Sequence, residues 1–267
     1  MTIEKVTDLI RDELDEINIY IDKILGTVSE EKTRNYMKYF MKGNGHRLRP
    51  MMVVLSYKCF KKEYDGDLIK LSTVLEFLHT ASLIHDDVID EADERRGQKS
   101  LNSVKGNKNA ILIGNVFYLE AFRLASEFSD LVYFNNMLKT SMEMCFGEVI
   151  QSETFGTRLD SKLYLDIIRR KTALLISISC SAGARLAGAN EEQISLMGEI
   201  GLIIGYLYQI KDDMKDFDVA FEDTVNIQAL NKEFNINFHE KYNKIPGDNI
   251  YKGAILAIKN IICLIES

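Results

Sequence analysis

Proline is almost absent from this chain: of its 267 residues, only Pro50 and Pro246 are prolines. Proline breaks helices because its ring removes a backbone donor and clashes with the preceding turn. The long stretch between the two prolines lacks this helix breaker, and apolar residues recur in it at the three- and four-residue spacing of helices. Because 46% of the residues are apolar, enough for a large buried core, we predict an all-α, single-domain helical bundle.

The apolar spacing also predicts where the individual helices lie. They are expected over about residues 3–25, 30–42, 49–60, 66–92, 108–128, 131–155, 160–187, 191–217 and 250–265. The polar segment 93–107 contains glycines and is expected to form a loop. Between about 217 and 249, asparagines and mixed charges replace the helical pattern. We therefore expect one domain over 1–267, whose part after about 217 is shortened or atypical.

Composition excludes several classes of function. The formal net charge of −7 argues against a nucleic-acid partner, because phosphate backbones are bound by clustered basic side chains. The cysteines lie far apart, which predicts reduced, mostly buried thiols rather than a zinc site or a disulfide framework. Neither a signal peptide nor an apolar run of the roughly 18–20 residues that span a bilayer is apparent. We expect no transmembrane segment and a cytoplasmic location.

Two aspartate clusters have the same spacing: Asp86-Asp87-Val88-Ile89-Asp90 and Asp212-Asp213-Met214-Lys215-Asp216. Residues four apart share a helix face, and like charges there repel by roughly 0.2–0.5 kcal/mol per pair. A single cluster of this kind is more often a solvated acidic helix end, but its repetition favours a binding site. Carboxylates without His or Cys partners suit Mg²⁺, which also binds substrate phosphates. Two facing clusters would therefore hold a metal-bound diphosphate.

Five motifs occur in a characteristic order over residues 43–216. They are Gly45-His46-Arg47-Leu48-Arg49-Pro50, the first aspartate cluster with His79 before it and Arg95-Arg96-Gly97 after it, Gly147-Glu148-Val149-Ile150-Gln151, Lys171-Thr172-Ala173, and the second aspartate cluster preceded by Gln209. In this order they closely resemble the trans-isoprenyl diphosphate synthases, also called polyprenyl synthetases. The resemblance implies the all-α isoprenoid synthase fold with a central active-site cavity.

The same resemblance implies an activity. Family members condense isopentenyl diphosphate with an allylic prenyl diphosphate to make a longer trans-prenyl diphosphate, with three Mg²⁺ ions when diphosphate is bound. The predicted metal ligands are Asp86, Asp87, Asp90, Asp212, Asp213 and Asp216. Ionisation of the allylic diphosphate gives a carbocation, which the double bond of isopentenyl diphosphate attacks. The predicted catalytic residues are Asp86, Asp90, Lys171, Thr172, Gln209 and Asp212.

Substrate contacts follow from the matching motif positions. The resemblance assigns isopentenyl diphosphate to His46, Arg49, His79 and Arg96, and the allylic diphosphate to Arg95, Lys171, Thr172 and Gln209. Guanidinium groups suit this task because they bind phosphate oxygens bidentately. Ordinary roles remain open, since an arginine pair is commonly a surface charge and polar residues within a helix are commonly satisfied by its backbone. For His85, which flanks the cluster on another face, packing is the better interpretation.

Product length is predicted from the helix that precedes the first cluster. The growing tail should run down this helix, away from the aspartates, past residues one to three turns below Asp86. The four candidate wall residues are Ala81, Ser82, Leu78 and Leu75. The first two are small, whereas the family stops short products with bulky aromatics there. We predict a product of twenty carbons or more, with the facing helix near Phe117 and Tyr118 as an alternative floor.

The chain also departs from the family pattern. His46 stands where the family usually has lysine, and histidine is mostly neutral at pH 7. Few residues follow Asp216, without the lysine-bearing loops of the family. Two alternatives therefore stay open, a class I terpene cyclase and a subunit of a heteromeric prenyl diphosphate synthase. The resemblance favours a homodimer and leaves a heteromer open.

Overall fold

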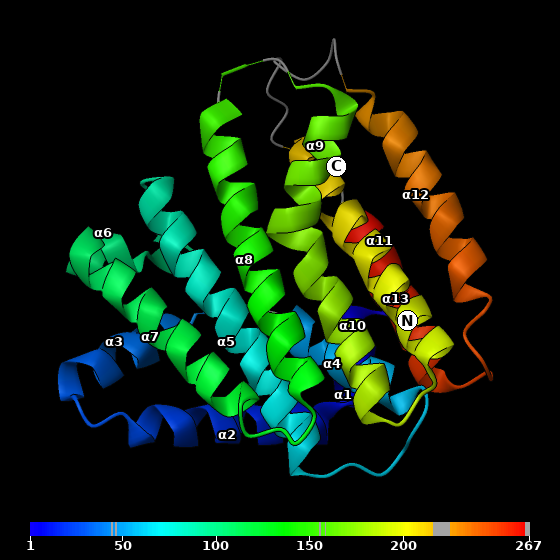
Figure 1. The fold of residues 1–267 in the computed structure, drawn as a ribbon, viewed down its shortest axis with the longest axis horizontal. Helices are drawn as coiled ribbons and strands as arrows, with labels where there is room; N and C mark the ends of the chain where they lie inside the picture. Colours follow the sequence, from blue (N-terminus) through cyan, green and yellow to red (C-terminus); the bar gives the residue numbers. More distant parts are fainter. Residues whose placement is uncertain (44, 46, 155, 158, 216–224, 265–267) are drawn as a thin grey trace.

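The structure, a computed structural model, describes residues 1–43, 45, 47–154, 156–157, 159–215 and 225–264. It is built almost entirely of helices, which confirms the predicted all-α bundle (Figure 1). In the N-terminal half these are α1 (Ile3–Leu9), α2 (Arg11–Thr27), α3 (Glu31–Met41), α4 (Leu48–Lys58), α5 (Gly66–Ile89), α6 (Leu101–Lys105) and α7 (Asn107–Ala125). They are followed by α8 (Leu131–Thr154), α9 (Ser161–Ile168), the π-helical turn η1 (Arg169–Ala173), α10 (Leu174–Leu186), α11 (Glu191–Lys215), α12 (Ile227–Tyr242) and α13 (Ile250–Leu264).

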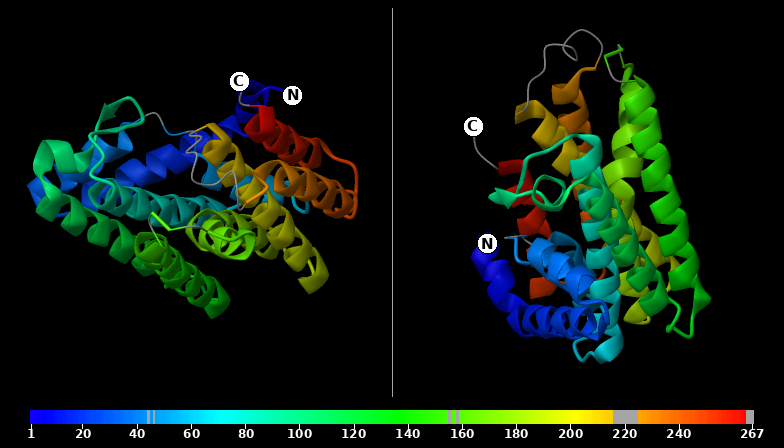
Figure 2. Two further views of the ribbon diagram at one scale, coloured as in Figure 1. Left: turned by 90° about the horizontal axis from the view of Figure 1, so that it is seen from above. Right: turned by 90° about the vertical axis from the view of Figure 1, so that its left-hand side faces the viewer.

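Helices α4 and α5 form the centre of the bundle. Every residue of α4 from Met51 to Leu55 is fully buried, which marks a helix that is packed on all sides. Helix α5 begins where Asp65 accepts a hydrogen bond from the amide of Asp67. Both views in Figure 2 place α5 between the N-terminal helices and the α7–α8 pair. The long central helix therefore carries its last turn, with the first aspartate cluster, from the core to one end of the molecule.

Three helix predictions need correction. The helix expected over 3–25 is divided at Ile10, whose backbone leaves the helical region at φ −126°. The helix expected over 160–187 is interrupted by η1. The segment 93–107, expected as a loop, contains α6 and a hairpin of β1 (Glu94–Arg95) and β2 (Gln98–Lys99). Arg96 and Gly97 form its turn with positive φ, the conformation that tight two-residue hairpins require.

Helix α12 lies in the segment where the sequence predicted no regular helix. Asn226 caps its start by accepting a hydrogen bond from the amide of Ala229. Phe234, Phe238 and Tyr242 are four residues apart and therefore share one helix face. Phe234 stacks on Tyr206 of α11 with ring centroids 4.5 Å apart. The asparagines between these aromatic residues weakened the helical pattern in the sequence, although the aromatic face packs α12 onto α11.

Within the described part of the chain, no helix is both long and apolar enough to cross a membrane. The side chains of Cys59, Cys145 and Cys180 are free thiols, and only the second of these three is exposed.

Candidate active site

The two aspartate clusters lie at the carboxyl ends of α5 and α11. In Figure 1 both of these helix ends point toward the top of the molecule. Asp86 is half-buried in the last turn of α5, and the exposed Asp90 follows that helix as its C-cap. The carboxyl end of a helix carries a partial negative charge, so carboxylates there are unfavourable unless a cation is near. Asp212 is half-buried in α11, whereas Asp216 lies outside the described residues.

Asp86 is the most perturbed carboxylate of the site. Burial and the negative charges of Glu148 and Asp90 together raise its pKa to about 7, although Lys171 partly opposes them. A divalent cation beside Asp86 would relieve this repulsion. No three described His, Cys, Asp or Glu side chains gather closely enough to enclose an ion by themselves. Because Mg²⁺ usually keeps several waters and shares one or two carboxylates with phosphate, Asp86 and Asp90 fit such an ion.

Asp87 and Arg95 are paired with each other. Asp87 is only 1% exposed, and its Oδ1 accepts a hydrogen bond of 2.6 Å from Nε of Arg95. Burial raises the pKa of Asp87, while Arg95 opposes the rise. The predicted metal ligand and the predicted diphosphate-binding arginine thus lie beside the site, joined in a partly buried ion pair. Their predicted roles are untested by this arrangement.

A second cluster is strongly basic. Arg49, His79 and Arg96 converge, with Nε2 of His79 lying 3.0 Å from Nη1 of Arg49 and 3.4 Å from Nη2 of Arg96. Burial and the arginines hold the pKa of His79 well below its usual 6.5, so its ring is neutral and can accept these bonds. Nε of Arg49 is buried and has no hydrogen-bond partner among the residues that the structure describes. Such a cluster is suited to an anion with several oxygens, such as a diphosphate.

Sequence reasoning missed the residues that brace this basic cluster. Arg47 has a positive φ of 51°, and its Nη1 donates a hydrogen bond of 2.6 Å to Oε1 of Glu76. Glu76 is 1% exposed and precedes His79 by three residues on the same face of α5. A glutamate three residues before the histidine was the sequence signal that could have pointed to Glu76. The neighbouring His46 lies outside the described residues, so its predicted contact with isopentenyl diphosphate is untested.

The Lys171-Thr172 motif is placed by the π-helical turn η1. Nζ of Lys171 lies 2.7 Å from Oε2 of Glu148 and 2.7 Å from Oε1 of Gln151, both on α8. Oγ1 of Thr172 donates a hydrogen bond of 2.9 Å to Oε1 of Gln209 on α11. The structure therefore brings three motifs together that are far apart in the sequence. π-Helical turns are rare and frequently occur at functional sites.

Gln209 is held in turn by the second aspartate cluster. Its Nε2 donates a hydrogen bond of 2.9 Å to Oδ1 of Asp213. Oδ2 of Asp213 accepts a hydrogen bond of 2.7 Å from the hydroxyl of Tyr164 on α9. Sequence reasoning did not select Tyr164, although it precedes Lys171 by two helical turns. Asp213, predicted to be a metal ligand, is therefore linked to the side chains beside it.

A pocket of about 350 Å³ opens beside these groups, between α5, α7, α8 and η1. It is lined by Ser82, His85, Asp86, Ile89, Tyr118, Met144, Cys145, Glu148, Val149, Ser152 and Lys171. Its charged lining residues, Asp86, Glu148 and Lys171, belong to the motifs, and apolar side chains make up much of the remaining wall. This pocket combines a place for charge with a place for a hydrocarbon chain.

Only one of the four predicted wall residues, Ser82, lines this pocket. Leu75, Leu78 and Ala81 have no exposed surface and belong to the core of the bundle. Tyr118 of α7 lines the pocket instead, with its ring centroid 5.7 Å from that of His85. The observed pocket therefore follows the alternative floor on the facing helix more closely than the expected path down α5.

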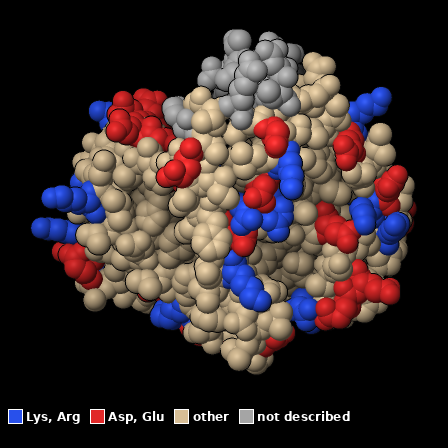
Figure 3. Space-filling model, turned by 45° about the horizontal axis from the view of Figure 1, so that its top comes forward, with Lys and Arg blue, Asp and Glu red and all other residues tan. Residues whose placement is uncertain are grey.

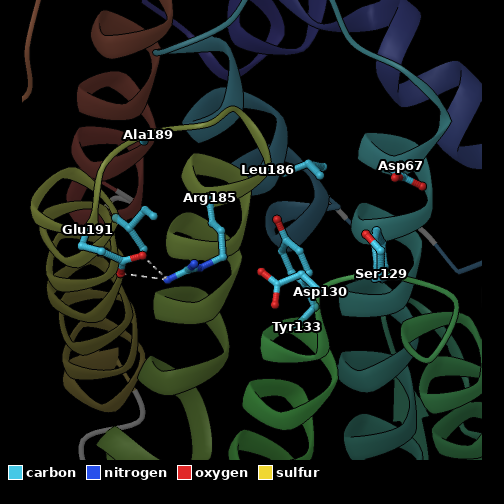
Figure 4. Close-up of a pocket in the computed structure, with 10 residues that line it drawn as sticks. Asp67, Ser129, Asp130, Tyr133, Arg185, Leu186, Ala189 and Glu191 are labelled. Atoms are coloured by element: carbon cyan, nitrogen blue, oxygen red, sulfur yellow. Dashed lines mark hydrogen bonds and ion pairs between the residues drawn. The ribbon is translucent and has the colours of Figure 1, made fainter.

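A further pocket, of about 310 Å³, lies near the start of α5 and the end of α10 (Figure 4). Arg185 donates hydrogen bonds of 3.0 and 2.9 Å to the two carboxylate oxygens of Glu191 there. Asp67, Asp130 and Tyr133 also line it. None of the predicted site residues belongs to this pocket, so we assign the candidate active site to the pocket beside Asp86.

Charge on the face above the candidate site is mixed. Figure 3 shows acidic and basic side chains interspersed in the middle of this face. Nucleic acids are bound by a continuous basic surface, which this arrangement does not resemble.

Comparison with known proteins gives a consistent result. The sequence profile of the Polyprenyl synthetase family matches residues 30–228. The short chain isoprenyl diphosphate synthase of Methanocaldococcus jannaschii is 33% identical over 206 residues, which cover 76% of this chain and 61% of that protein. Heptaprenyl diphosphate synthase component 2 of Geobacillus stearothermophilus is 37% identical over 182 residues, 67% of this chain and 56% of that protein.

A solved structure shows the same fold. The polyprenyl synthase of Caulobacter crescentus, determined with calcium and isoprenyl diphosphate, superposes with a TM-score of 0.83 at 19% identity. The superposition covers 98% of this chain and 97% of that one. The family profile spans most of the chain and includes both aspartate clusters, and the chain therefore belongs to the polyprenyl synthetase family.

Proposed function

We propose that the protein is a Mg²⁺-dependent prenyltransferase that condenses isopentenyl diphosphate with an allylic diphosphate. The observation that carries this proposal is the pocket beside Asp86, whose lining combines carboxylates and Lys171 with apolar side chains such as Tyr118 and Met144. A metal-bound diphosphate with an apolar tail matches this combination. The separate cluster of Arg49, His79 and Arg96 supplies a place for a second diphosphate.

The carboxylate set supports Mg²⁺ as the metal. When bound by Asp86, Asp90 and Asp212, Mg²⁺ would neutralise the charge that builds on the departing diphosphate. We expect three ions in the complex with diphosphate. Each predicted ligand offers hard carboxylate oxygen, and the raised pKa of Asp86, at about 7, reflects the unfavourable negative charge there.

The protein's own groups position the two substrates. The guanidinium groups of Arg49 and Arg96 would hold isopentenyl diphosphate, with neutral His79 as an acceptor between them. Oγ1 of Thr172 and Oε1 of Gln209 would turn their negative ends toward the allylic carbon as positive charge develops on it. As the C–O bond of the allylic diphosphate breaks and diphosphate leaves, the double bond of isopentenyl diphosphate attacks this carbon. The departing diphosphate then takes up the proton that is lost, and the chain has grown by five carbons. Positioning and electrostatics account for most of the catalysis.

The product is proposed to contain twenty carbons or more. Ser82, one turn below Asp86, lines the pocket and leaves room for a tail to pass. Tyr118 and Met144 come from the facing helices α7 and α8 and would contact the tail from the other side of the pocket.

A direct assay tests the proposed activity. The purified chain is incubated with Mg²⁺, isopentenyl diphosphate and primers of five, ten or fifteen carbons, and products are identified by mass. We expect labelled isopentenyl diphosphate to appear in longer prenyl diphosphates. Release of a hydrocarbon without its incorporation would instead support the class I terpene cyclase alternative.

We propose in addition that the protein is a homodimer, paired through α7 and α8. These helices expose several large apolar side chains, among them Leu112, Leu119 and Phe146, which pairing of two copies would cover. The similar Geobacillus protein is named as one component of a heptaprenyl diphosphate synthase, so a heteromer is the alternative. Activity that appears only when another subunit is added would support a heteromer.

A cytoplasmic location, which cell fractionation would test, is also proposed.

A further inference from the structure

We propose that Tyr164 is a positioning residue, which fixes the orientation of Gln209 and Thr172 by way of Asp213. The proposal rests on the prenyltransferase function proposed above. Tyr164 belongs to α9, which contributes none of the residues that the motifs assign to the site. Its hydroxyl nevertheless lies 2.7 Å from Oδ2 of Asp213. It therefore contacts the second aspartate cluster from outside the pocket.

A series of hydrogen bonds links Tyr164 to Thr172 through Asp213 and Gln209, and the donor and acceptor of each bond can be assigned. A carboxylate only accepts, so Asp213 must face the hydroxyl of Tyr164 and the amide nitrogen of Gln209. The amide oxygen of Gln209 is thereby turned toward Thr172. It accepts the single hydroxyl proton of Thr172 at 2.9 Å. The order of donors is thus Tyr164 to Asp213, Gln209 to Asp213, and Thr172 to Gln209.

This order determines what the site offers to a substrate. Because Thr172 uses its one hydroxyl proton on Gln209, its oxygen presents lone pairs to any other neighbour. Oxygens aligned before the reaction stabilise developing positive charge without the cost of reorientation. If Gln209 were reversed, its amide hydrogens would face Thr172, and the hydroxyl of Thr172 would turn its proton elsewhere. Tyr164 disfavours that reversal by holding Asp213 in place.

The surroundings of Tyr164 make its hydroxyl the informative group. The ring is 3% exposed and packs in an apolar cluster with Ile168, Tyr206 and Ile210. Burial of the ring alone would be equally served by phenylalanine. The hydroxyl therefore adds a function beyond packing, because its oxygen lies within hydrogen-bonding distance of Asp213.

The substitution Tyr164→Phe isolates the hydroxyl, and Tyr206→Phe is a matched control in the same apolar cluster. We expect Tyr164→Phe to lower kcat about tenfold, the scale of one hydrogen bond to a charged group, and to change KM for each diphosphate less than about twofold. Both variants should melt within a few degrees of the wild-type protein. A residue with only a packing role would lower the melting temperature and leave kcat of the folded enzyme unchanged.

A second measurement does not depend on activity. The side-chain amide signal of Gln209 is assigned by NMR through its loss in Gln209→Ala. Its protons should exchange slowly with solvent in the wild-type protein and in Tyr206→Phe, and faster in Tyr164→Phe. If the wild-type chain elongates no primer, the proposed function is wrong, and this exchange rate still decides the role of Tyr164. Equal exchange in all three proteins, or equal kcat in the two tyrosine variants, would overturn the proposal.

Discussion

Buried charges at the candidate site differ in whether a protein group neutralises them. Asp87 has Arg95, and Glu76 has Arg47, each within hydrogen-bonding distance. Asp86, in contrast, is compensated only in part, because Glu148 and Asp90 disfavour its charge more than Lys171 and Arg95 favour it. Paired charges hold the site together, whereas a partly compensated carboxylate is where a cation gains most. This distinction divides adjacent residues of one motif into different roles.

Asp86→Asn tests that distinction. Because the folded pKa of Asp86 is about 7 and its usual value is 3.8, the charged form is disfavoured in the folded protein. Stability from this group is therefore present at low pH and lost as pH rises from 3.8 to about 7. At pH 8 without Mg²⁺ we expect Asp86→Asn to have a higher free energy of unfolding than the wild type, measured in urea. Prenyl transfer should fall more than about a hundredfold, since the variant loses a metal ligand.

Asp87→Asn serves as the comparison for Asp86→Asn. It removes the charge that pairs with Arg95, but it also removes a buried charge whose pKa is itself raised, so at pH 8 we expect a smaller gain in the free energy of unfolding than for Asp86→Asn. An equal gain in both variants would show that the pairing with Arg95 does not distinguish the two aspartates.

His79 gives a pH dependence of the opposite kind. Its folded pKa lies well below 6.5, so below pH 6.5 the unfolded chain takes up a proton that the folded protein does not. Stability should fall as the pH drops below 6.5, by up to about 1.4 kcal/mol per pH unit. His79→Gln removes this contribution while retaining a hydrogen-bond acceptor. The difference in unfolding free energy between wild type and variant should be constant above pH 7 and change below 6.5; a constant difference throughout would contradict the buried, neutral histidine.

At the scale of the structural elements, η1 packs closely against both of its neighbours at the site. A Cβ placed on Gly205 of α11 would lie 2.4 Å from Cα of Ala173, and one on Gly147 of α8 would lie 2.7 Å from Cβ of Arg170. Both neighbouring helices therefore approach η1 at a glycine. The widened turn between them directs Lys171 toward α8 and Thr172 toward α11.

Gly205→Ala should disturb this element. The added methyl meets backbone rather than a flexible side chain, so η1 must move, and we expect a loss of about 1–3 kcal/mol in unfolding free energy together with a lower kcat. Gly253→Ala in α13 is the control, because no atom of the described residues lies within 4 Å of the added Cβ. The control should be neutral or gain up to about 1 kcal/mol from its better helix propensity. Similar melting temperatures for the two variants would show that the close approach is not required.

The sequence predicted most of the elements and fewer of their connections. Apolar spacing predicted the positions of the long helices. The motifs predicted that Asp86, Lys171 and Gln209 belong to one site, and the structure places them at the same end of the bundle. Periodicity could not show η1, because an inserted residue shifts the pattern only locally. It also missed α12, whose aromatic face around Phe238 was hidden among asparagines. Tyr164 and Glu76 were missed because their importance depends on partners that only the folded chain brings near.

The packing of α7 against α5 is where we expect the proposed product length to be set. Tyr118 lines the pocket, whereas Leu75 and Leu78 are enclosed in the core. We expect Tyr118→Ala to shift the product distribution toward longer chains, as measured by mass after a long incubation. Tyr118→Phe keeps the ring and should leave the distribution unchanged. If Tyr118→Ala made the same products as the wild type, the residues that limit chain length would have to lie on α5 instead.

At the scale of the molecule, the site is assembled from helices that are distant in the chain. Helices α4 and α5 and the β1–β2 hairpin contribute the basic cluster, α5 and α11 the aspartates, and α8 and η1 the groups around Lys171. The outer surfaces of α7 and α8, which also wall the pocket, carry the exposed apolar side chains. Pairing of two copies at this surface would therefore support the pocket wall in addition to covering apolar area.

Phe146→Asp tests this arrangement, since Phe146 is 47% exposed on α8 and would be buried in the proposed dimer. In the dimer the introduced carboxylate would lose its water of hydration and gain no cation in return, which disfavours association. We therefore expect the variant to be monomeric by light scattering. Ile236→Asp is the control, because Ile236 is 51% exposed on α12, away from α7 and α8. The control should keep the wild-type mass. If the monomeric variant makes shorter products, the dimer contributes to the pocket wall. A wild-type chain that is itself monomeric, and whose mass doubles only with a different subunit, would replace the homodimer by a heteromer.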